Sequence, residues 1–192
     1  MAAIALVAIA AWPFLGARPV SASRAYVAPV LPDYRYRDAT IAFYERRVRA
    51  DSRDQISARL LAGEYMQRYR ETQDAGDILR ALHQARRALA LQPQNNAAAD
   101  AIIASGYTAL HRFADALKFE RAAHLERSDD SNAVAQIASL EMEMGHYEVA
   151  ARDLRMAAHI ATTPTVMAVQ ARYDELTGQI DAARRLLTDA AA

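Results

Sequence analysis

The sequence contains no cysteine, and this absence removes several classes of functional site. Without a thiol the chain cannot form a disulfide, supply a thiolate nucleophile or hold a metal through sulfur. Glycine and proline are also scarce, at six residues each among 192. Because both residues interrupt helices, their scarcity favours a chain built mainly of helices.

The chain also lacks net charge at neutral pH, with 23 basic and 23 acidic residues. Proteins that bind nucleic acid usually present a basic surface, so we do not expect DNA or RNA as the main ligand. The charges are unevenly spread, because residues 1–95 hold 14 arginines against 9 acids while residues 96–192 hold 9 basic residues against 14 acids. This gradient has two readings. Either the charges vary at random over solvent-exposed faces, or they form a dipole that orients a partner.

Hydrophobic residues make up 53% of the chain, which is enough for a buried core. Residues 2–17 are apolar or small throughout. This run is shorter than the roughly 20 residues that span a bilayer as a helix. Val20-Ser21-Ala22 has the small residues of a signal-peptide cleavage site. Arginines follow the run and none precedes it, which opposes export of the C-terminal part.

The sequence therefore predicts a signal peptide or membrane anchor in residues 1–22, with a buried cytoplasmic helix as a third possibility. Residues 23–37 contain two prolines and no helical period, so we expect an extended tether. The predicted location is exported, in the periplasm or associated with the envelope. The alternative is an array that stays anchored to the membrane.

Residues 38–192 contain a repeating pattern with a period of 33 to 35 residues. His124 and His159 close two similar helical stretches 35 residues apart, and Gly145 and Gly178 begin two similar turns 33 residues apart. A period of this length with two helices per unit is typical of a stacked helical repeat.

Small and apolar residues recur at fixed positions in both helices of each unit. The first helices carry Leu61, Ala62, Tyr65, Ile103, Ala104, Tyr107, Ile137 and Ala138. The turns and second helices carry Gly76, Ile78, Ala81, Ala88, Pro93, Phe113, Ala116, Ala123, Gly145, Tyr147, Ala150, Ala157, Gly178, Ile180, Ala183 and Ala190. This pattern resembles the tetratricopeptide repeat (TPR). The resemblance implies an all-α fold in which antiparallel helix pairs stack as a right-handed superhelix.

The predicted array has about four units and a preceding half repeat. Their bounds are 38–54 for the half repeat, then 55–95, 97–130, 131–163 and 164–192. The first full unit is longer than the others because residues 69–75 are extra. We expect them to lengthen the helix from Gln55 to about Thr72, so that its end projects from the array.

Specific residues are expected to end one helix and start the next. Pro93 lacks a backbone donor and ends the helix before it, after which Asn95 or Asn96 can cap the following helix. Capping residues at 51–54 and 128–131 are predicted to do the same without a proline.

The TPR resemblance implies a concave groove lined by the first helix of each unit. The groove residues are predicted to include Arg59, Met66, Gln67, Ala101, Ser105, Asn132, Ala135, Glu143 and Arg172. A shallow lining of small residues with few charges suits an apolar or helical segment of a partner protein. The alternative is that these small residues only permit tight curvature.

No catalytic residue, metal site or cofactor is expected. Four of the five histidines recur at the repeat spacing and none forms an H-x-x-x-H pair, and no phosphate-binding or nucleophile motif is present. We expect His124 and His159 to lie in the last turns of their helices, where positive charge is favourable.

The predicted function is a non-catalytic scaffold or adaptor that binds a protein segment in bacterial envelope assembly or secretion. One alternative is a membrane-anchored cytoplasmic regulator of a neighbouring membrane protein. Another is a helical enzyme or small-ligand sensor that uses His111, His146 and nearby acids.

Overall fold

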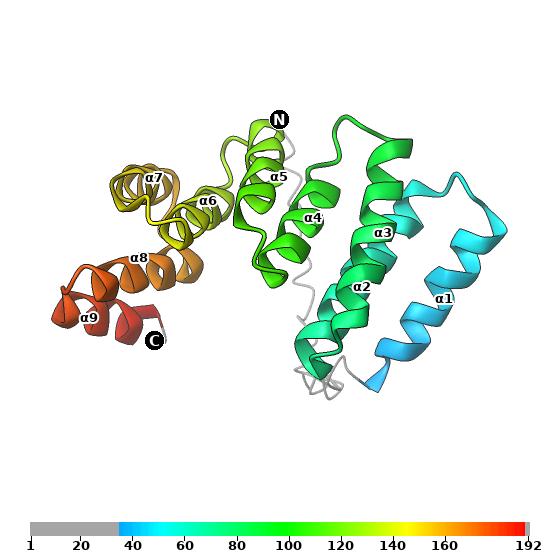
Figure 1. Ribbon diagram of the computed structural model, residues 1–192, viewed down its shortest axis with the longest axis horizontal. Coiled ribbons are helices and arrows are strands. Elements are labelled where there is room, and N and C mark those ends of the chain that lie inside the picture. Colours follow the sequence, from blue (N-terminus) through cyan, green and yellow to red (C-terminus); the bar gives the residue numbers. More distant parts are fainter. Residues whose placement is uncertain (1–34, 191–192) are drawn as a thin grey trace, which may run out of the picture. The chain divides into compact units, whose positions relative to one another are not determined.

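The computed structural model describes residues 35–190, and this part of the chain consists of helices without strands (Figure 1). The predictions for residues 1–22 and for most of the tether lie outside the described residues. The helices are α1 (Arg37–Ala50), α2 (Gln55–Thr72), α3 (Ala75–Leu91), α4 (Ala97–Ala109), α5 (Phe113–Glu126), α6 (Ser131–Glu143), α7 (Tyr147–Ile160), α8 (Pro164–Leu176) and α9 (Ile180–Ala190). The all-α repeat fold is therefore confirmed.

The helices stack as successive hairpins along the chain (Figure 1). The closest partners are α2 with α3, α4 with α5, α6 with α7, and α8 with α9, while α1 packs on α2. Two neighbouring first helices, α2 and α4, contact each other, and so do α6 and α8. The second helices α3, α5 and α7 make at most marginal contact with one another. The layer of first helices is thus the tighter one and forms the inner surface of the array.

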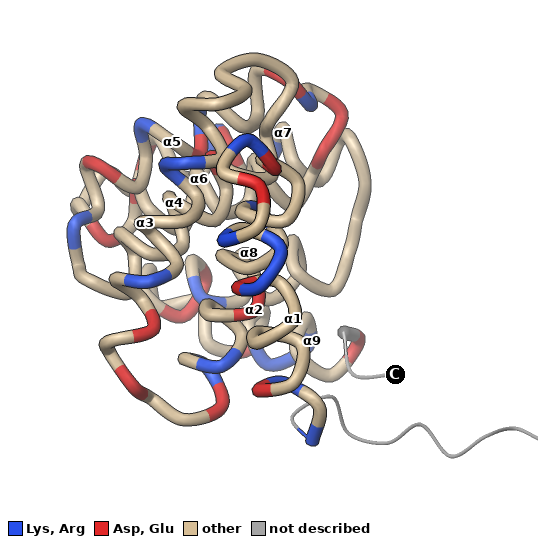
Figure 2. The backbone as a smooth tube through the Cα atoms, turned by 90° about the vertical axis from the view of Figure 1, so that its right-hand side faces the viewer, with Lys and Arg blue, Asp and Glu red and all other residues tan. Residues whose placement is uncertain are grey.

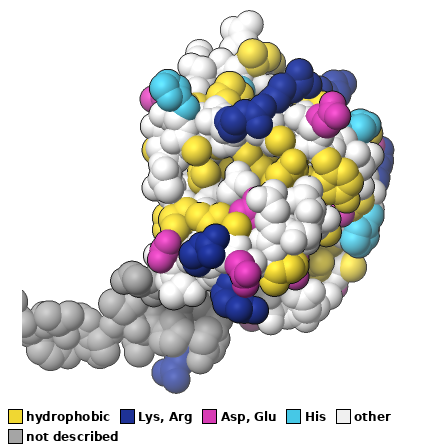
Figure 3. All heavy atoms as spheres, turned by 90° about the vertical axis from the view of Figure 1, so that its left-hand side faces the viewer, with side chains coloured by type: hydrophobic (Ala, Val, Ile, Leu, Met, Phe, Trp, Pro, Cys, Tyr) yellow, Lys and Arg dark blue, Asp and Glu magenta, His cyan; other side chains and the backbone are white. Residues whose placement is uncertain are grey.

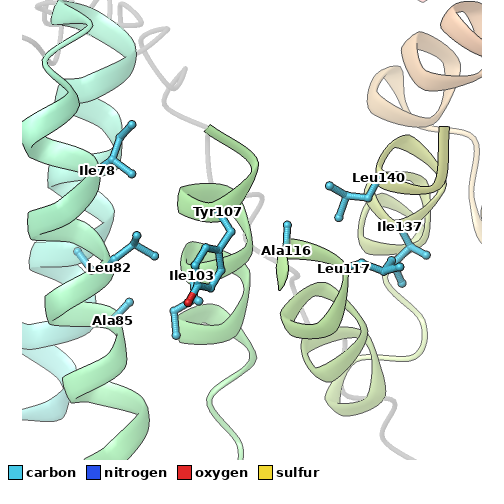
Figure 4. Packing of buried hydrophobic residues seen from close by; sticks show 10 residues of the cluster. Ile78, Leu82, Ala85, Ile103, Tyr107, Ala116, Leu117, Ile137 and Leu140 are labelled. Carbon is cyan, nitrogen blue, oxygen red and sulfur yellow. The ribbon is translucent and has the colours of Figure 1, made fainter. Parts of the chain in front are cut away.

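Buried alanines allow the helices to approach each other closely. The alanines of the repeat pattern that the structure describes are buried where the helices cross, among them Ala62, Ala81, Ala116, Ala123, Ala138, Ala150 and Ala157 at 0% exposure. Other residues of the pattern are exposed, namely Pro93, Gly145, Tyr147, Gly178 and Ile180. Larger side chains fill the spaces between helices, and Figure 4 shows Ile78 and Leu82 of α3 directed toward Ile103 of α4. Because each hairpin buries its apolar face against the next, stability comes mainly from stacking.

Helix starts are fixed by side-chain caps at the predicted turns. Asp54 accepts hydrogen bonds from the Ser57 backbone (2.9 Å) and hydroxyl (2.7 Å). Asp130 accepts from the backbone of Asn132 and Ala133 at 3.0 and 3.2 Å. Each carboxylate satisfies donors that a helix N-terminus leaves open, as the capping residues at both turns predict.

Asn96 caps a different helix from the one predicted. It stands at the N-terminus of α4 but makes no side-chain bond to that helix. Its amide nitrogen instead donates to the carbonyls of Ala88 (3.2 Å) and Gln92 (3.1 Å) at the end of α3. The side chain therefore satisfies carbonyls at the end of the preceding helix that have no backbone partner, because Pro93 prevents the helical hydrogen bonds from continuing.

The turn inside each hairpin uses a residue with left-handed backbone geometry. These residues are Gln73 (φ 60°), His111 (φ 55°), Gly145 (φ 80°) and Gly178 (φ 85°). His111 is thus the structural counterpart of Gly145, and not of His146 one residue later. His124 and His159 do lie in the last turns of α5 and α7, as predicted.

Among the extra residues 69–75 only Tyr69 packs on the core, whereas residues 70–75 are exposed at the end of α2 and in the turn that follows. The helix ends at Thr72 as predicted, but the half-buried Tyr69 packs against both large apolar clusters. Arg68 also binds the buried Asp77 of α3 through two bonds of 2.7 Å. This contact joins α2 to the first turn of α3 just before the exposed end of α2.

The surface of the described residues mixes charges of both signs. Basic and acidic positions are interspersed along the helices in Figure 2. Figure 3 views the end of the array that includes α9, where apolar side chains lie among charged ones. Leu176, Ile180 and Leu187 are about half exposed there. Within residues 35–190, no helix combines the length and apolar character needed to cross a bilayer.

Candidate protein-binding groove

The inner surface of the array contains a hollow of about 340 Å³ between α2, α4, α5 and α6. Its lining combines apolar, small and polar side chains: Met66, Tyr69, Arg70, Ser105, Thr108, Ala109, Glu120, Gln136 and Leu140. This volume lies within the range of about 300 to 1,000 Å³ that is usual for ligand-binding pockets.

The hollow exists because two neighbouring first helices stand apart. In the described residues α2 contacts α4 and α6 contacts α8, whereas α4 and α6 make at most marginal contact. Ser105, Thr108 and Ala109 face the resulting gap from α4 with short side chains. The second helix α5 consequently forms the floor of the groove, and Glu120 lies on that floor.

A second, smaller hollow of about 170 Å³ extends the first along α2 and α4. The two share Met66, Arg70 and Ser105, and the second adds Gly63, Ala101 and Ile102. The shared residues make the two hollows one surface. This surface, which we call the inner groove, comprises the lining residues of both hollows.

A third hollow lies at the ends of α5 and α3 and includes Arg59, Asn95 and Glu126. Glu126 accepts a hydrogen bond of 2.7 Å from the backbone of Asn95. This bond fixes the loop between α3 and α4 against the end of α5.

The arginines near the inner groove form hydrogen bonds or ion pairs with neighbouring side chains. Arg70 donates to the side-chain oxygen of Gln67 through two bonds of 3.0 and 2.7 Å. Farther along, Arg172 of α8 pairs with Glu143 of α6 at 2.5 Å. Arg70 is exposed and its partner is a neutral amide, so the rim of the groove keeps this positive charge, whereas the charge of Arg172 is paired.

Glu120 differs from these residues because it is buried without a partner. Its side chain is 8% exposed, and no hydrogen bond or ion pair joins it to another described residue. Burial, helped by the nearby Asp130 and opposed by Arg127, raises the pKa of its carboxyl to about 7. A buried carboxyl that lacks a cation is expected to hold its proton near neutral pH.

The structure brings only part of the predicted residue set together. Met66 and Ser105 line the main hollow, Ala101 lines the second, and Arg59 lies in the third. Gln67 lies beside the inner groove as the partner of Arg70.

The other predicted residues lie outside these hollows. Glu143 and Arg172 form the ion pair between α6 and α8. Asn132 accepts a 2.6 Å hydrogen bond from the hydroxyl of Thr163 and so joins α6 to the start of α8.

Ala135 was wrongly placed in the groove. It is fully buried in a cluster with Val134, Ala157 and Val166. The next residue, Gln136, faces the inner groove instead. Alanine suits both a helix contact and a groove wall, so its residue type did not decide between them. The polar Gln136, in a helix rich in apolar residues, was the available signal.

The histidines of the sensor alternative lie at different turns. His146 stands at the start of α7 with its Nδ1 atom 2.8 Å from Oε2 of Glu141. Glu141 also accepts a 2.5 Å bond from Arg121, so this carboxylate ties three helices together. His111 packs edge-on against Phe113. Within the described residues, no group of three or more His, Asp or Glu side chains is placed to hold a metal ion.

Solved structures show which known fold this array shares. A thermophilic TPR protein from Thermus thermophilus, TTC0263, superposes with a TM-score of 0.68 at 18% identity, covering 82% of each chain. The chain has the tetratricopeptide repeat fold. MamA superposes with a TM-score of 0.64 at 18% identity, covering 80% of this chain and 86% of MamA.

A third structure, MamA of Desulfovibrio magneticus RS-1 from residue 41 to its end, gives a TM-score of 0.65 at 12% identity. It covers 82% of this chain and 86% of that one. No family model and no curated protein sequence matches the chain. At these identities the likeness establishes the TPR fold.

Proposed function

We propose that this TPR array is a non-catalytic adaptor that binds a segment of a partner protein in its inner groove. The observation that carries the proposal is the hollow formed where α4 and α6 separate, together with its extension along α2 and α4. Its floor and walls combine apolar side chains such as Met66 and Leu140 with a few polar groups. Such a lining can hold an amphipathic helix or an extended segment through apolar anchors.

The cellular role that we propose is assembly or secretion of envelope proteins. This role requires residues 1–22 to carry the array out of the cytoplasm as a signal peptide. If the same residues remain as an anchor, the array would instead regulate a neighbouring membrane protein. N-terminal sequencing of the mature protein separates the two, because cleavage would leave Ser23 as the first residue.

Groove binding can be tested by affinity capture from a lysate of the source organism. The full-length chain is compared with the double variant Ala101→Arg/Ser105→Arg, which places two bulky cations in the inner groove. Ala135 is unsuitable for such a variant because its side chain is buried. Ala90→Arg on the exposed surface of α3 adds the same side chain outside the groove and serves as the control.

The proposal predicts proteins that bind the wild type and Ala90→Arg but not the groove variant. Circular dichroism must show equal helix content and melting behaviour for all three chains. Partners that bind all three equally, or that are lost only with Ala90→Arg, would place binding on another surface.

A further inference from the structure

Glu120 gives the inner groove a chemical preference that the rest of its lining lacks. The carboxyl lies on α5 at the floor of the main hollow, where the gap between α4 and α6 leaves it open to the groove. It is more than nine-tenths buried and has no hydrogen-bond or ion-pair partner among the described residues. A buried carboxylate is costly unless a positive group or several donors satisfy it.

The charged groups around Glu120 do not supply that partner. Arg127 and Asp130, in the turn between α5 and α6, act on it in opposite directions and pair with each other at 3.6 Å. Arg70 of α2 also lines the hollow, but its guanidinium donates to Gln67. The lining residues from α4 and α6 are uncharged. The hollow therefore offers a carboxyl whose positive partner is not supplied by its surroundings.

The walls of the hollow suit the stem of a long basic side chain. Met66, Ala109 and Leu140 are apolar and lie around the same space as the carboxyl. Lysine and arginine bury their methylene chains against apolar surface while the charged end reaches a polar partner. A basic side chain entering from the groove would thus find apolar contacts along its length and a carboxyl at its end.

We infer that the inner groove selects a partner segment with a lysine or arginine, whose side chain enters the main hollow and pairs with Glu120. This inference rests on the proposed function and adds to it the chemistry of the partner. The free carboxyl then loses its proton when the cation binds, so binding should strengthen as the pH rises from 6 to 8.

The test uses a displayed library of random 12-residue peptides selected against the full-length chain at pH 8. Parallel selections use Glu120→Gln, which keeps the side-chain shape and removes the charge, and the groove variant Ala101→Arg/Ser105→Arg. Asp115→Asn is the matched control, because it removes one negative charge from the same helix at an exposed ion pair.

Peptides that bind the wild type are expected to share one lysine or arginine. Its replacement by glutamine should weaken binding about tenfold or more, in line with the loss of a charge-assisted hydrogen bond. The same weakening should follow from Glu120→Gln but not from Asp115→Asn. For the wild type, affinity should fall between pH 8 and pH 6.

Two results would overturn the inference. If the wild type selects peptides that need no basic residue, and Glu120→Gln selects the same ones, groove binding stands but the pairing with Glu120 does not. If the wild type enriches nothing beyond what the groove variant enriches, both the inference and the proposed function fail.

Discussion

Gly106 of α4 lies so close to Leu82 of α3 that a β-carbon at Gly106 would be 2.7 Å from Cδ2 and 2.9 Å from Cγ of the leucine. Real side-chain contacts do not approach this distance, so the two helices meet only because position 106 has no side chain. The contact sets how closely one repeat stacks on the next, which is the interaction that stabilises the array.

Gly106→Ala is therefore expected to lower the free energy of unfolding by up to about 2 kcal/mol. The overpacking cost, roughly 1 to 3 kcal/mol, exceeds the gain in helix propensity. Gly63→Ala is the matched control, because its nearest neighbour would be Ile102 at 4.0 Å. That variant should gain about 0.5 to 1 kcal/mol. Urea unfolding of both variants measures the difference, and equal effects would show that the α3–α4 contact can relax.

The left-handed backbone geometry of His111 is expected to lower the stability of the chain, and a glycine at this position should restore it. His111 occupies the turn position that Gly145 and Gly178 fill in the next units. His111→Gly is expected to stabilise the chain by up to about 1 kcal/mol, because only glycine adopts this geometry without a steric penalty.

Gly145→Ala should destabilise the chain by about 1 kcal/mol, since its added β-carbon meets nothing within 4 Å and only the backbone is strained. Thermal unfolding of the two variants provides the comparison. A His111→Gly protein less stable than the wild type would mean that the contact between His111 and Phe113 outweighs the strain.

Glu120 should make stability depend on pH in a specific window. Its pKa rises from an ordinary 4.5 to about 7 in the folded chain, so the folded state keeps a proton that the unfolded state releases. The stability that comes from holding this proton in the folded state is fully present below pH 4.5 and is lost as the pH rises through 7. Glu120→Gln should therefore stabilise the chain at pH 8 relative to the wild type, by up to about 3 kcal/mol, with little effect at pH 4.5.

Melting curves of wild type and Glu120→Gln at pH 4.5, 6 and 8 measure this dependence. A stability difference that stays constant across the three values would show that Glu120 is not the group that titrates.

Asp54 should make stability fall, and not rise, as the pH is lowered. The side chain and backbone of Ser57, together with Arg47, hold the pKa of its carboxyl at about 2, below the ordinary 3.8. Its contribution is present above pH 3.8 and disappears as the pH falls through 2. Asp54→Ala should cost about 1 to 2 kcal/mol at pH 7, the usual cost of losing a helix cap, and less at pH 3. Asp51→Ala, in the same turn, should cost less at pH 7; an equal loss would argue against the capping role.

The buried repeat positions could be predicted from the sequence, because small residues recur there with the period of the repeat. Ala62, Ala104 and Ala138 recur where the helices cross, and all three are buried. The groove was harder to predict, since a small residue such as Ala135 fits a helix contact equally well.

Glu120 could not be predicted from the sequence as a floor residue. A glutamate on an alanine-rich helix resembles any solvated charge, and its position in the hollow depends on the separation of α4 and α6, which is a property of the stacked units. Asn96 was misassigned for a related reason, because its side chain turns back to the carbonyls of Ala88 and Gln92.

The most direct test of groove binding is photo-cross-linking in cells of the source organism. A photo-reactive phenylalanine replaces Ser105 in the inner groove, or Ala90 on the exposed face of α3, in the full-length chain. The account predicts a discrete cross-linked partner from position 105 and none from position 90. Cross-links from position 90 together with none from position 105 would contradict it.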